Sequence, residues 1–351
     1  MSLLATRLQN FRDDNPNYDK WEHRAKKAGF LDLHVKQNND PESIVSPQTV
    51  QKALDSVGST LEIPVLNFDS GVQVTNETLR LTTPYSGNTS ALETITFVHI
   101  YFGFGIYPAL HKNNEISMQR DFDRKMKKHL IEVRNQLNDL GRDNCENNKS
   151  QVLQDDLGGR YSFTSNVVLA PLGEQDSYIG DTSLLMSEND FDVDEIDIVA
   201  NASTESIIRN RLMEQNEFNQ RDKRYQWLDK NFYFTSNLSN DVGNKATMFA
   251  LMPGSVGLVQ QFQPDCLMGH STADGHIWDI ENLPMLNMPF GTYYYEGAYD
   301  ATAVGGASTA HLTATKGQWF AFHSAFAFMR AYNSDRATIP GSILKVALQN
   351  S

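Results

Sequence analysis

Residues 61–98 read LEIPVLNFDSGVQVTNETLRLTTPYSGNTSALETITFV, and residues 114–140 read NEISMQRDFDRKMKKHLIEVRNQLNDL. In the first stretch apolar and polar side chains largely alternate and glycines punctuate the run, as is typical of extended β-structure. Its apolar residues are Ile63, Val65, Leu66, Val72, Val74, Leu79 and Leu81. They are too few to bury a core of their own, so we expect this arm to lie on a neighbouring copy of the chain. The arm therefore predicts a building block of an assembly.

The second stretch predicts a long amphipathic helix that spans about 35–40 Å. Its apolar residues recur at spacings of three and four, which places them on one stripe of a helix. The stripe consists of Phe122, Met126, Leu130, Val133 and Leu137, and Leu140 continues it. Gly141 is expected to end the helix. By itself the stripe fits a helix packed on its own sheet as well as a helix used in assembly.

Length and charge indicate a soluble structural protein. The chain has 351 residues and a net charge of −13, which argues against coating nucleic acid or an acidic membrane, because both need clustered Lys and Arg. Much of the negative charge falls in 155–197, where Arg160 is the single base. Cys145 and Cys266 are far apart in the sequence and predict no disulfide framework, so we expect a reducing compartment. No secretory signal is visible at the start, and the most apolar run, 95–110, is too short to cross a bilayer.

The remaining segments predict an α+β fold without internal repeats. A first helix is expected from Asn15 and Pro16 to Gly29, and a second begins at the N-cap Ser46 with Pro47 in its first turn. Later helices are expected over 203–220 and 253–262, and strands over 196–200, 231–238, 245–252, 291–303, 317–332 and 343–348.

Two groups of side chains are candidate metal sites. Cys266, His270 and His276, with Asp265, Asp274 and Asp279 nearby, are the densest group of potential ligands. Their spacing matches no familiar zinc pattern, but a metal-dependent enzyme using this group is kept as an alternative. The run of acids that starts at Asp190 imitates a calcium loop, yet Glu195 and Asn201 occupy its sixth and twelfth positions, where glycine and glutamate are needed.

The order of these parts resembles the major capsid protein of tailed bacteriophages, whose fold is shared with encapsulin shells and the floor of the herpesvirus capsid. The segments that carry the resemblance are TLEIPVLNFDSGVQVTN, ISMQRDFDRKMKKHLIEVRNQL, IDIVANASTESIIRNRL and NFYFTSNLSNDVGNKATMFALMPGSVGLVQQF. The resemblance implies an N-terminal arm over 1–60, an extended β-loop over 61–98, and a peripheral domain over 99–160 with its spine helix at 114–140. It also implies a mainly axial domain over 161–290, and a return to the peripheral domain with a C-terminal strand over 291–351.

The resemblance also implies a function. We expect a structural major capsid protein, not an enzyme, that self-assembles into hexamers and pentamers of an icosahedral shell enclosing double-stranded DNA. Expected partners are further copies of the chain, a portal, separate scaffolding and decoration proteins, and DNA packaged without sequence-specific contact; no membrane is expected. The location would be the virion capsid, assembled in the host cytoplasm. The arm and the helix stripe would serve assembly, with no catalytic, cofactor-binding or metal-binding residues. The alternative within the same fold is an encapsulin-like nanocompartment shell.

Overall fold

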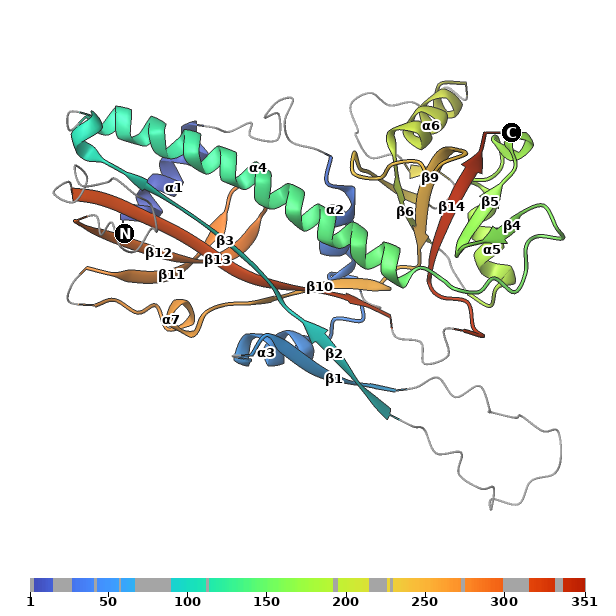
Figure 1. Ribbon diagram of the computed structural model, residues 1–351, viewed down its shortest axis with the longest axis horizontal. Coiled ribbons are helices and arrows are strands. Elements are labelled where there is room, and N and C mark those ends of the chain that lie inside the picture. Colours follow the sequence, from blue (N-terminus) through green and yellow to red (C-terminus); the bar gives the residue numbers. More distant parts are fainter. Residues whose placement is uncertain are drawn as a thin grey trace, which may run out of the picture.

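The computed structural model describes residues 3–14, 27–40, 43–56, 58–66, 90–111, 114–191, 195–214, 226–227, 230–272, 275–298, 316–331 and 337–350. These residues form two units, each built on one sheet, and a two-stranded hairpin that projects from them (Figure 1). The two units are called here the five-stranded unit and the seven-stranded unit. No helix of the described chain is both long and apolar enough to cross a membrane.

The five-stranded unit consists of one antiparallel sheet under the long helix α4 (Glu115–Asn148) (Figure 1). Its strands run in the order β10 (Val256–Gln261), β13 (Lys316–Arg330), β12 (Met288–Ala298) and β11 (Ile277–Leu283). The fifth strand, β3 (Val98–Ile106), pairs with β13. Because β3 and β12 pair with the same residues of β13, they must lie on its two opposite edges.

Aromatic side chains hold the helix on the sheet. Phe122 of α4 meets Phe320 of β13 edge to face, with ring centroids 5.1 Å apart, and meets Phe104 of β3 in the same way at 5.4 Å. A helix that the sequence analysis did not predict, α1 (Leu3–Asp14), joins the same core. Its signal was present in the sequence, because Leu4, Leu8 and Phe11 recur at helical spacing and are fully buried.

The seven-stranded unit is the second compact body. Its sheet has the order β4 (Ser162–Thr164), β5 (Val167–Ala170), β14 (Ile343–Gln349), β9 (Asn244–Leu251), β6 (Ile196–Ala200), β8 (Lys230–Phe234) and β7 (Gln226–Trp227). The pairs β5–β14 and β6–β8 are parallel. Helices α5 (Asp181–Glu188) and α6 (Ala202–Glu214) belong to this unit (Figure 1). All five residues of β6 are buried, as expected of a central strand covered on both faces.

The hairpin and two short helices complete the described fold. The hairpin pairs β1 (Thr60–Leu66) with β2 (Ser90–Thr96), and β2 leads directly into β3. The predicted helix after Ser46 is confirmed as α3 (Pro47–Asp55), and the Ser46 side chain accepts a hydrogen bond from the Thr49 N–H at 3.2 Å. Helix α2 (Gly29–Gln37) lies between the two units (Figure 1). Shorter elements are α7 (Pro264–Leu267) and the 3₁₀ turns η2 (Pro108–His111) and η3 (Leu172–Glu174).

The predictions that Gly29 and Gly141 each end a helix are wrong. Gly141 does not end α4, which continues to Asn148. A Cβ atom at Gly141 would lie 3.2 Å from the Phe30 Cβ, so glycine there lets α2 pack closely on α4. Gly29 does not end a helix but begins α2, where a Cβ would lie 2.7 Å from the Phe234 carbonyl oxygen. Most of the predicted helix 15–29 lies outside the described residues.

The predicted helix over 253–262 is also wrong, because this segment contains the strand β10. Gly254 has a φ of +71°, which turns the chain at the point where a helix would start. The following residues then pair with β13 in the five-stranded sheet. The other predicted elements of the body are present as β6, α6, β8, β9, β12, β13 and β14. Residues 215–220, 299–303 and 332 of these predictions lie outside the described residues.

Candidate assembly surfaces

The base of the hairpin is fixed to the outer face of the five-stranded sheet, the face away from α4. One apolar cluster joins α3, the hairpin and the sheet, and it contains Val45, Ala53, Leu61, Phe97, Val259, Ala325, Ala327 and Met329. A Cβ atom at Gly257 would collide with the Val45 side chain, so glycine permits this close contact. Arg330 at the end of β13 forms an ion pair with Glu93 of β2 at 3.2 Å. The direction in which the hairpin leaves the body is therefore set by packing and by charge.

The apolar residues of the predicted arm fall into two groups. Ile63 lies in β1 and is half-buried against the basal cluster, and Val65 and Leu66 belong to the same strand. Val72, Val74, Leu79 and Leu81 lie outside the described residues. On the partner strand Leu92 is 66 % exposed, although it has the size of a core side chain. Ile63 at the base of the hairpin is thus partly buried by its own chain, whereas Leu92 is exposed.

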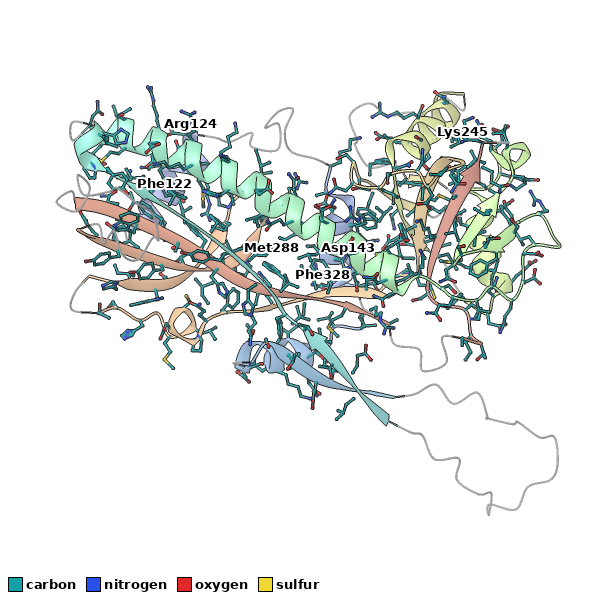
Figure 2. The ribbon with its side chains drawn as sticks, viewed as in Figure 1. Phe122, Arg124, Asp143, Lys245, Met288 and Phe328 are labelled. Carbon is teal, nitrogen blue, oxygen red and sulfur yellow. The ribbon has the colours of Figure 1, made fainter. Side chains whose placement is uncertain are left out.

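The helix stripe faces the protein's own core. Phe122, Met126, Leu130 and Leu137 are fully buried, and Val133 is 3 % exposed. All five belong to one cluster with β3, β13 and α1. The stripe therefore packs on the chain's own sheet, and Figure 2 shows Phe122 on the sheet side of α4 and Arg124 on the opposite side.

The exposed face of α4 carries a basic row that the sequence analysis missed. Arg120, Arg124 and Lys128 stand four residues apart and are exposed, and none forms an ion pair with another described residue. Like charges at this spacing destabilise a helix by a few tenths of a kcal/mol per pair. The repeated spacing of four was the signal available in the sequence. Such a row on a chain with net charge −13 marks the face as a candidate contact surface.

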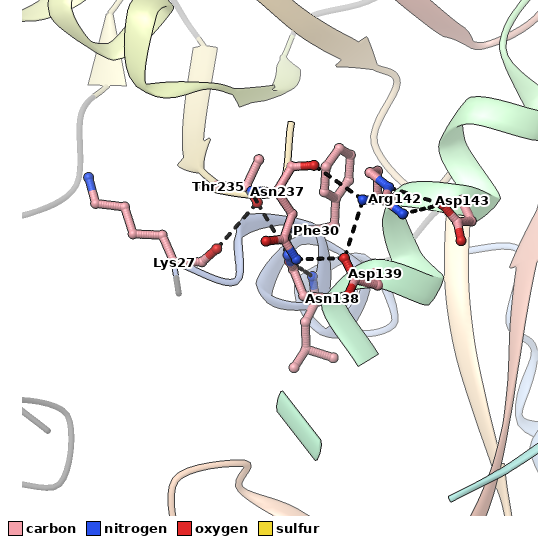
Figure 3. Close-up of polar contacts among 9 residues, drawn as sticks. Lys27, Phe30, Asn138, Asp139, Arg142, Asp143, Thr235 and Asn237 are labelled. Atoms are coloured by element: carbon pink, nitrogen blue, oxygen red, sulfur yellow. Dashed lines mark hydrogen bonds and ion pairs between the residues drawn. The ribbon is translucent and has the colours of Figure 1, made fainter. Parts of the chain in front are cut away.

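A buried amide connects the two units (Figure 3). The Asn138 side chain of α4 is 1 % exposed, and its Oδ1 accepts the N–H of Phe30 at 3.0 Å and of Leu31 at 3.4 Å. Its Nδ2 donates to the Thr235 Oγ1 at 3.2 Å. One side chain thus links the first turn of α2 and the end of β8 through hydrogen bonds.

The proposed metal ligands are not gathered. Cys266 lies in α7 against the Thr292 carbonyl oxygen, and burial raises the pKa of its thiol to about 11, so the thiol remains protonated near neutral pH. The His276 Nδ1 is 2.6 Å from the Tyr293 hydroxyl, and the His270 ring packs edge-on against Trp278. Within the described residues no three His, Cys, Asp or Glu side chains form a group that could hold a metal. Asp274, Asp192 and Asp194 lie outside those residues.

Comparisons with known proteins place the fold. A solved structure from Gordonia phage Cozz matches over 95 % of this chain and 90 % of that chain, with a TM-score of 0.50 and 9 % identity. The chain shares the fold of this phage structure. The predicted α+β fold class is therefore confirmed, and at this identity the likeness concerns the fold alone.

Two further structures are similar at lower scores. The capsid structure of Cyanophage P-SCSP1u matches 84 % of this chain and 85 % of that chain, with a TM-score of 0.46 and 9 % identity. The Cyanophage Pam1 capsid asymmetric unit matches 83 % of this chain and 85 % of that chain, with a TM-score of 0.44 and 10 % identity. No family model matches the sequence, and no curated protein matches it.

Proposed function

We propose that this chain is a structural major capsid protein that self-assembles into hexamers and pentamers of an icosahedral shell around double-stranded DNA. The fold shared with the Gordonia phage Cozz structure over 95 % of this chain supports this proposal. The observation that carries it is the hairpin, whose base is fixed on the sheet by an apolar cluster while Leu92 stays exposed. An apolar strand pair that leaves its own body gains burial only against another molecule.

In this proposal the five-stranded unit, with α4 as its spine helix, is the peripheral domain. The seven-stranded unit is the axial domain. The C-terminal part of the chain then serves both domains, because β13 pairs in the five-stranded sheet and β14 in the seven-stranded sheet. Residues 256–290 contain β10, β11 and the start of β12, which lie in the five-stranded sheet. In this proposal they therefore belong to the peripheral domain, although the axial domain was expected to extend over 161–290.

The partners follow from the proposed role. Further copies of the chain are the main partners, and a portal completes the particle. Scaffolding and decoration proteins, where the particle uses them, are separate proteins. The net charge of −13 favours packaging of DNA without tight or sequence-specific binding. The protein would be found in the virion capsid, after assembly in the host cytoplasm, and we propose no enzymatic role for it.

An encapsulin-like shell would use the same fold to enclose other cargo. Neighbouring genes separate these two functions, because a terminase and a portal accompany a virus, whereas a cargo enzyme accompanies a nanocompartment. The metal-dependent enzyme receives no support from the positions of Cys266 and His276, whose side chains have other partners.

The proposal is tested by assembling the full-length chain and a variant with a shortened arm. In the variant, Asn-Gly replaces residues 66–90, and the replacement starts from the pair Val65↔Ala91. This pair follows the hydrogen-bonded alternation set by the Phe97 N–H to Ser59 carbonyl bond, so a two-residue turn fits there. Full-length protein should give closed shells by electron microscopy. The variant should keep the circular dichroism and melting temperature of the body and give no shells.

A matched control replaces residues 66–90 with a Gly-Ser segment of the same length. This control should also fail to form shells, because it restores length without apolar side chains. Shells from the Asn-Gly variant would contradict the role of the arm, and the absence of any closed particle from the full-length chain would contradict the capsid function.

A further inference from the structure

The five-stranded sheet has three edge strands, β10, β11 and β3. The chain itself covers the edges of β10 and β11. On β10, the Asn38 side chain accepts the Leu258 N–H at 2.8 Å and donates to the Leu258 carbonyl oxygen at 2.7 Å. The Gln37 Oε1 accepts the Val256 N–H at 2.9 Å. The side-chain amides of Gln37, the last residue of α2, and of Asn38, which follows it, thus take the place of a further strand along this edge.

The β11 edge is covered by a loop and by charge. The Trp278 N–H donates to the His270 carbonyl oxygen at 2.8 Å, which places the segment after α7 along this edge. Further along, β11 carries Asp279 and Glu281. Charged side chains on an edge strand are a common means of preventing strand addition.

The third edge belongs to β3, and the pairing pattern shows which of its groups point outward. The Ala331 N–H donates to the Ser255 carbonyl oxygen, so odd-numbered residues of β13 bond toward β10 and β12. Even-numbered residues of β13 therefore bond to β3, where they meet Ile100, Phe102 and Phe104. In β3 the N–H and C=O groups of residues 99, 101, 103 and 105 point away from the sheet. Among the described residues, the cover on these groups is the Lys125 Nζ, which donates to the Gly105 carbonyl oxygen at 2.8 Å.

The sequence of β3 does nothing to block pairing. The nine residues VHIYFGFGI contain no Asp, Glu, Lys, Arg or Pro. His99 and Gly103 are exposed, and Tyr101 is 69 % exposed. A long, uncharged and exposed edge of this kind is a template for a strand from another molecule.

The chain's own hairpin shows which kind of strand this edge takes. Because the Phe97 N–H donates to the Ser59 carbonyl oxygen, odd-numbered residues of β2 bond to β1. Odd-numbered residues of β3 continue that same edge, and β1 covers it along β2 and stops where β3 begins. An antiparallel strand thus already occupies the first half of the β2–β3 edge, and the second half has the same hydrogen-bonding groups with no strand beside it among the described residues.

We propose that the β3 edge is a strand-addition site, filled in the assembly by a strand of a second copy of this chain. This inference rests on the proposed function, because a shell brings copies into repeated contact. It assigns part of the assembly interface to main-chain hydrogen bonds of residues 99, 101 and 103. Specificity would come from the exposed His99 side chain beside them.

The experiment compares hydrogen–deuterium exchange of the 98–106 peptide in dilute monomer and in assembled protein. In the monomer, the outward amides should exchange quickly while those bonded to β13 stay protected. In the assembly, both sets should be slow. Closed shells in which the outward amides still exchange at the monomer rate would overturn the proposal and leave the capsid function intact. Open oligomers in which the outward amides are protected would support the β3 proposal and contradict the capsid function. Protein that stays monomeric at every concentration would overturn both proposals.

Substitutions at Tyr101 provide the second test. Tyr101→Pro removes an outward N–H without removing a hydrogen bond to β13, so the monomer should keep its fold. It should raise the protein concentration needed for assembly by about tenfold or more. Tyr101→Thr keeps the N–H and should assemble within about twofold of the wild type. If Tyr101→Pro proves unfolded, Tyr101→Lys decides, since it keeps the N–H but adds an edge charge. Normal assembly of a folded Pro or Lys variant would refute the proposal, and so would addition of a strand from another protein at this edge.

Discussion

The two sheets deal with their edges in opposite ways. Within the described residues the seven-stranded sheet ends in strands of three and two residues, β4 and β7, and its central strands β6 and β14 are almost entirely buried. The five-stranded sheet ends in long strands, and one of them, β3, has nine residues with an exposed and uncharged edge. A sheet that stands alone keeps its edges short. Among the described residues, this difference supports the proposal that the β3 edge of the five-stranded unit contacts other copies of the chain.

The largest loss of stability is expected from a substitution in the aromatic core of the five-stranded unit. Phe122→Ala removes a fully buried ring that contacts Phe320 and should lower the free energy of unfolding by about 3–5 kcal/mol. The matched control Leu110→Ala, at a side chain 74 % exposed, should change it by less than about 0.5 kcal/mol. Denaturant unfolding followed by circular dichroism measures both values.

That experiment also tests how far the two units are separate. A cluster containing Phe30, Cys145, Val199 and Val256 joins α2 and α4 to strands of both sheets. We therefore expect one cooperative transition in the wild type and in Phe122→Ala. Two resolved transitions, of which Phe122→Ala shifts one, would mean that the units are energetically independent.

Sequence patterns were sufficient where burial follows a regular period. The stripe from Phe122 to Leu137 identified α4, and Ser46 with Pro47 identified α3, because both signals lie within one element. Patterns failed where the chain's own packing decides. Gly141 reads as a helix end, yet it is buried against Phe30 within the helix. The segment after Gly254 reads as a helix, but pairing with β13, 70 residues later, makes it a strand.

The assembly surfaces were only partly readable for the same reason. The arm was visible as an alternating run between residues 61 and 98, but its attachment to α3 and β13 depends on contacts distant in sequence. The run VHIYFGFGI reads as a buried strand, and its sequence is compatible with a central position. Only the pairing of β13 on the other side reveals that β3 is an edge.

Mild acid should lower the stability of the protein through a buried histidine of α2. All described histidines lie outside the seven-stranded unit. His34 in α2 is fully buried, and burial lowers its pKa to about 4 from an ordinary 6.5. The unfolded chain therefore binds a proton at His34 at a higher pH than the folded chain does. The resulting stability is fully present above pH 6.5 and is lost as the pH falls through 4.

A His34→Gln variant isolates this effect. Between pH 7.5 and pH 4, the wild type should lose up to about 3 kcal/mol more than the variant, since each unit of pKa shift corresponds to about 1.4 kcal/mol. Chemical denaturation at a series of pH values provides the comparison. Parallel curves for the two proteins would show that His34 titrates in the folded protein as it does in the unfolded chain.

The junction between the units should be the next most sensitive point. Asn138→Ala leaves the Phe30 N–H without its acceptor and the Thr235 hydroxyl without one partner, which should cost about 1–3 kcal/mol. Asn147→Ala is the control, because Asn147 is exposed on the same helix, and should cost less than about 0.5 kcal/mol. Exchange of the α2 amides should rise in Asn138→Ala alone. Equal stabilities of the two variants would mean that Asn138 does not couple the units.

The smallest effect on stability is expected from the basic row on α4. Replacing Arg120, Arg124 and Lys128 with Gln removes two like-charge pairs spaced by four residues, which should stabilise the folded monomer by a few tenths of a kcal/mol. Assembly should respond in the opposite direction, becoming weaker and less sensitive to salt, because the variant no longer offers these charges to an acidic surface of a neighbouring copy. Light scattering at 50 and 500 mM NaCl measures this response, with Lys52→Gln on α3 as a single-charge control. A triple variant that is less stable than the wild type, and equally salt-dependent in assembly, would show that the row is an ordinary solvated helix face.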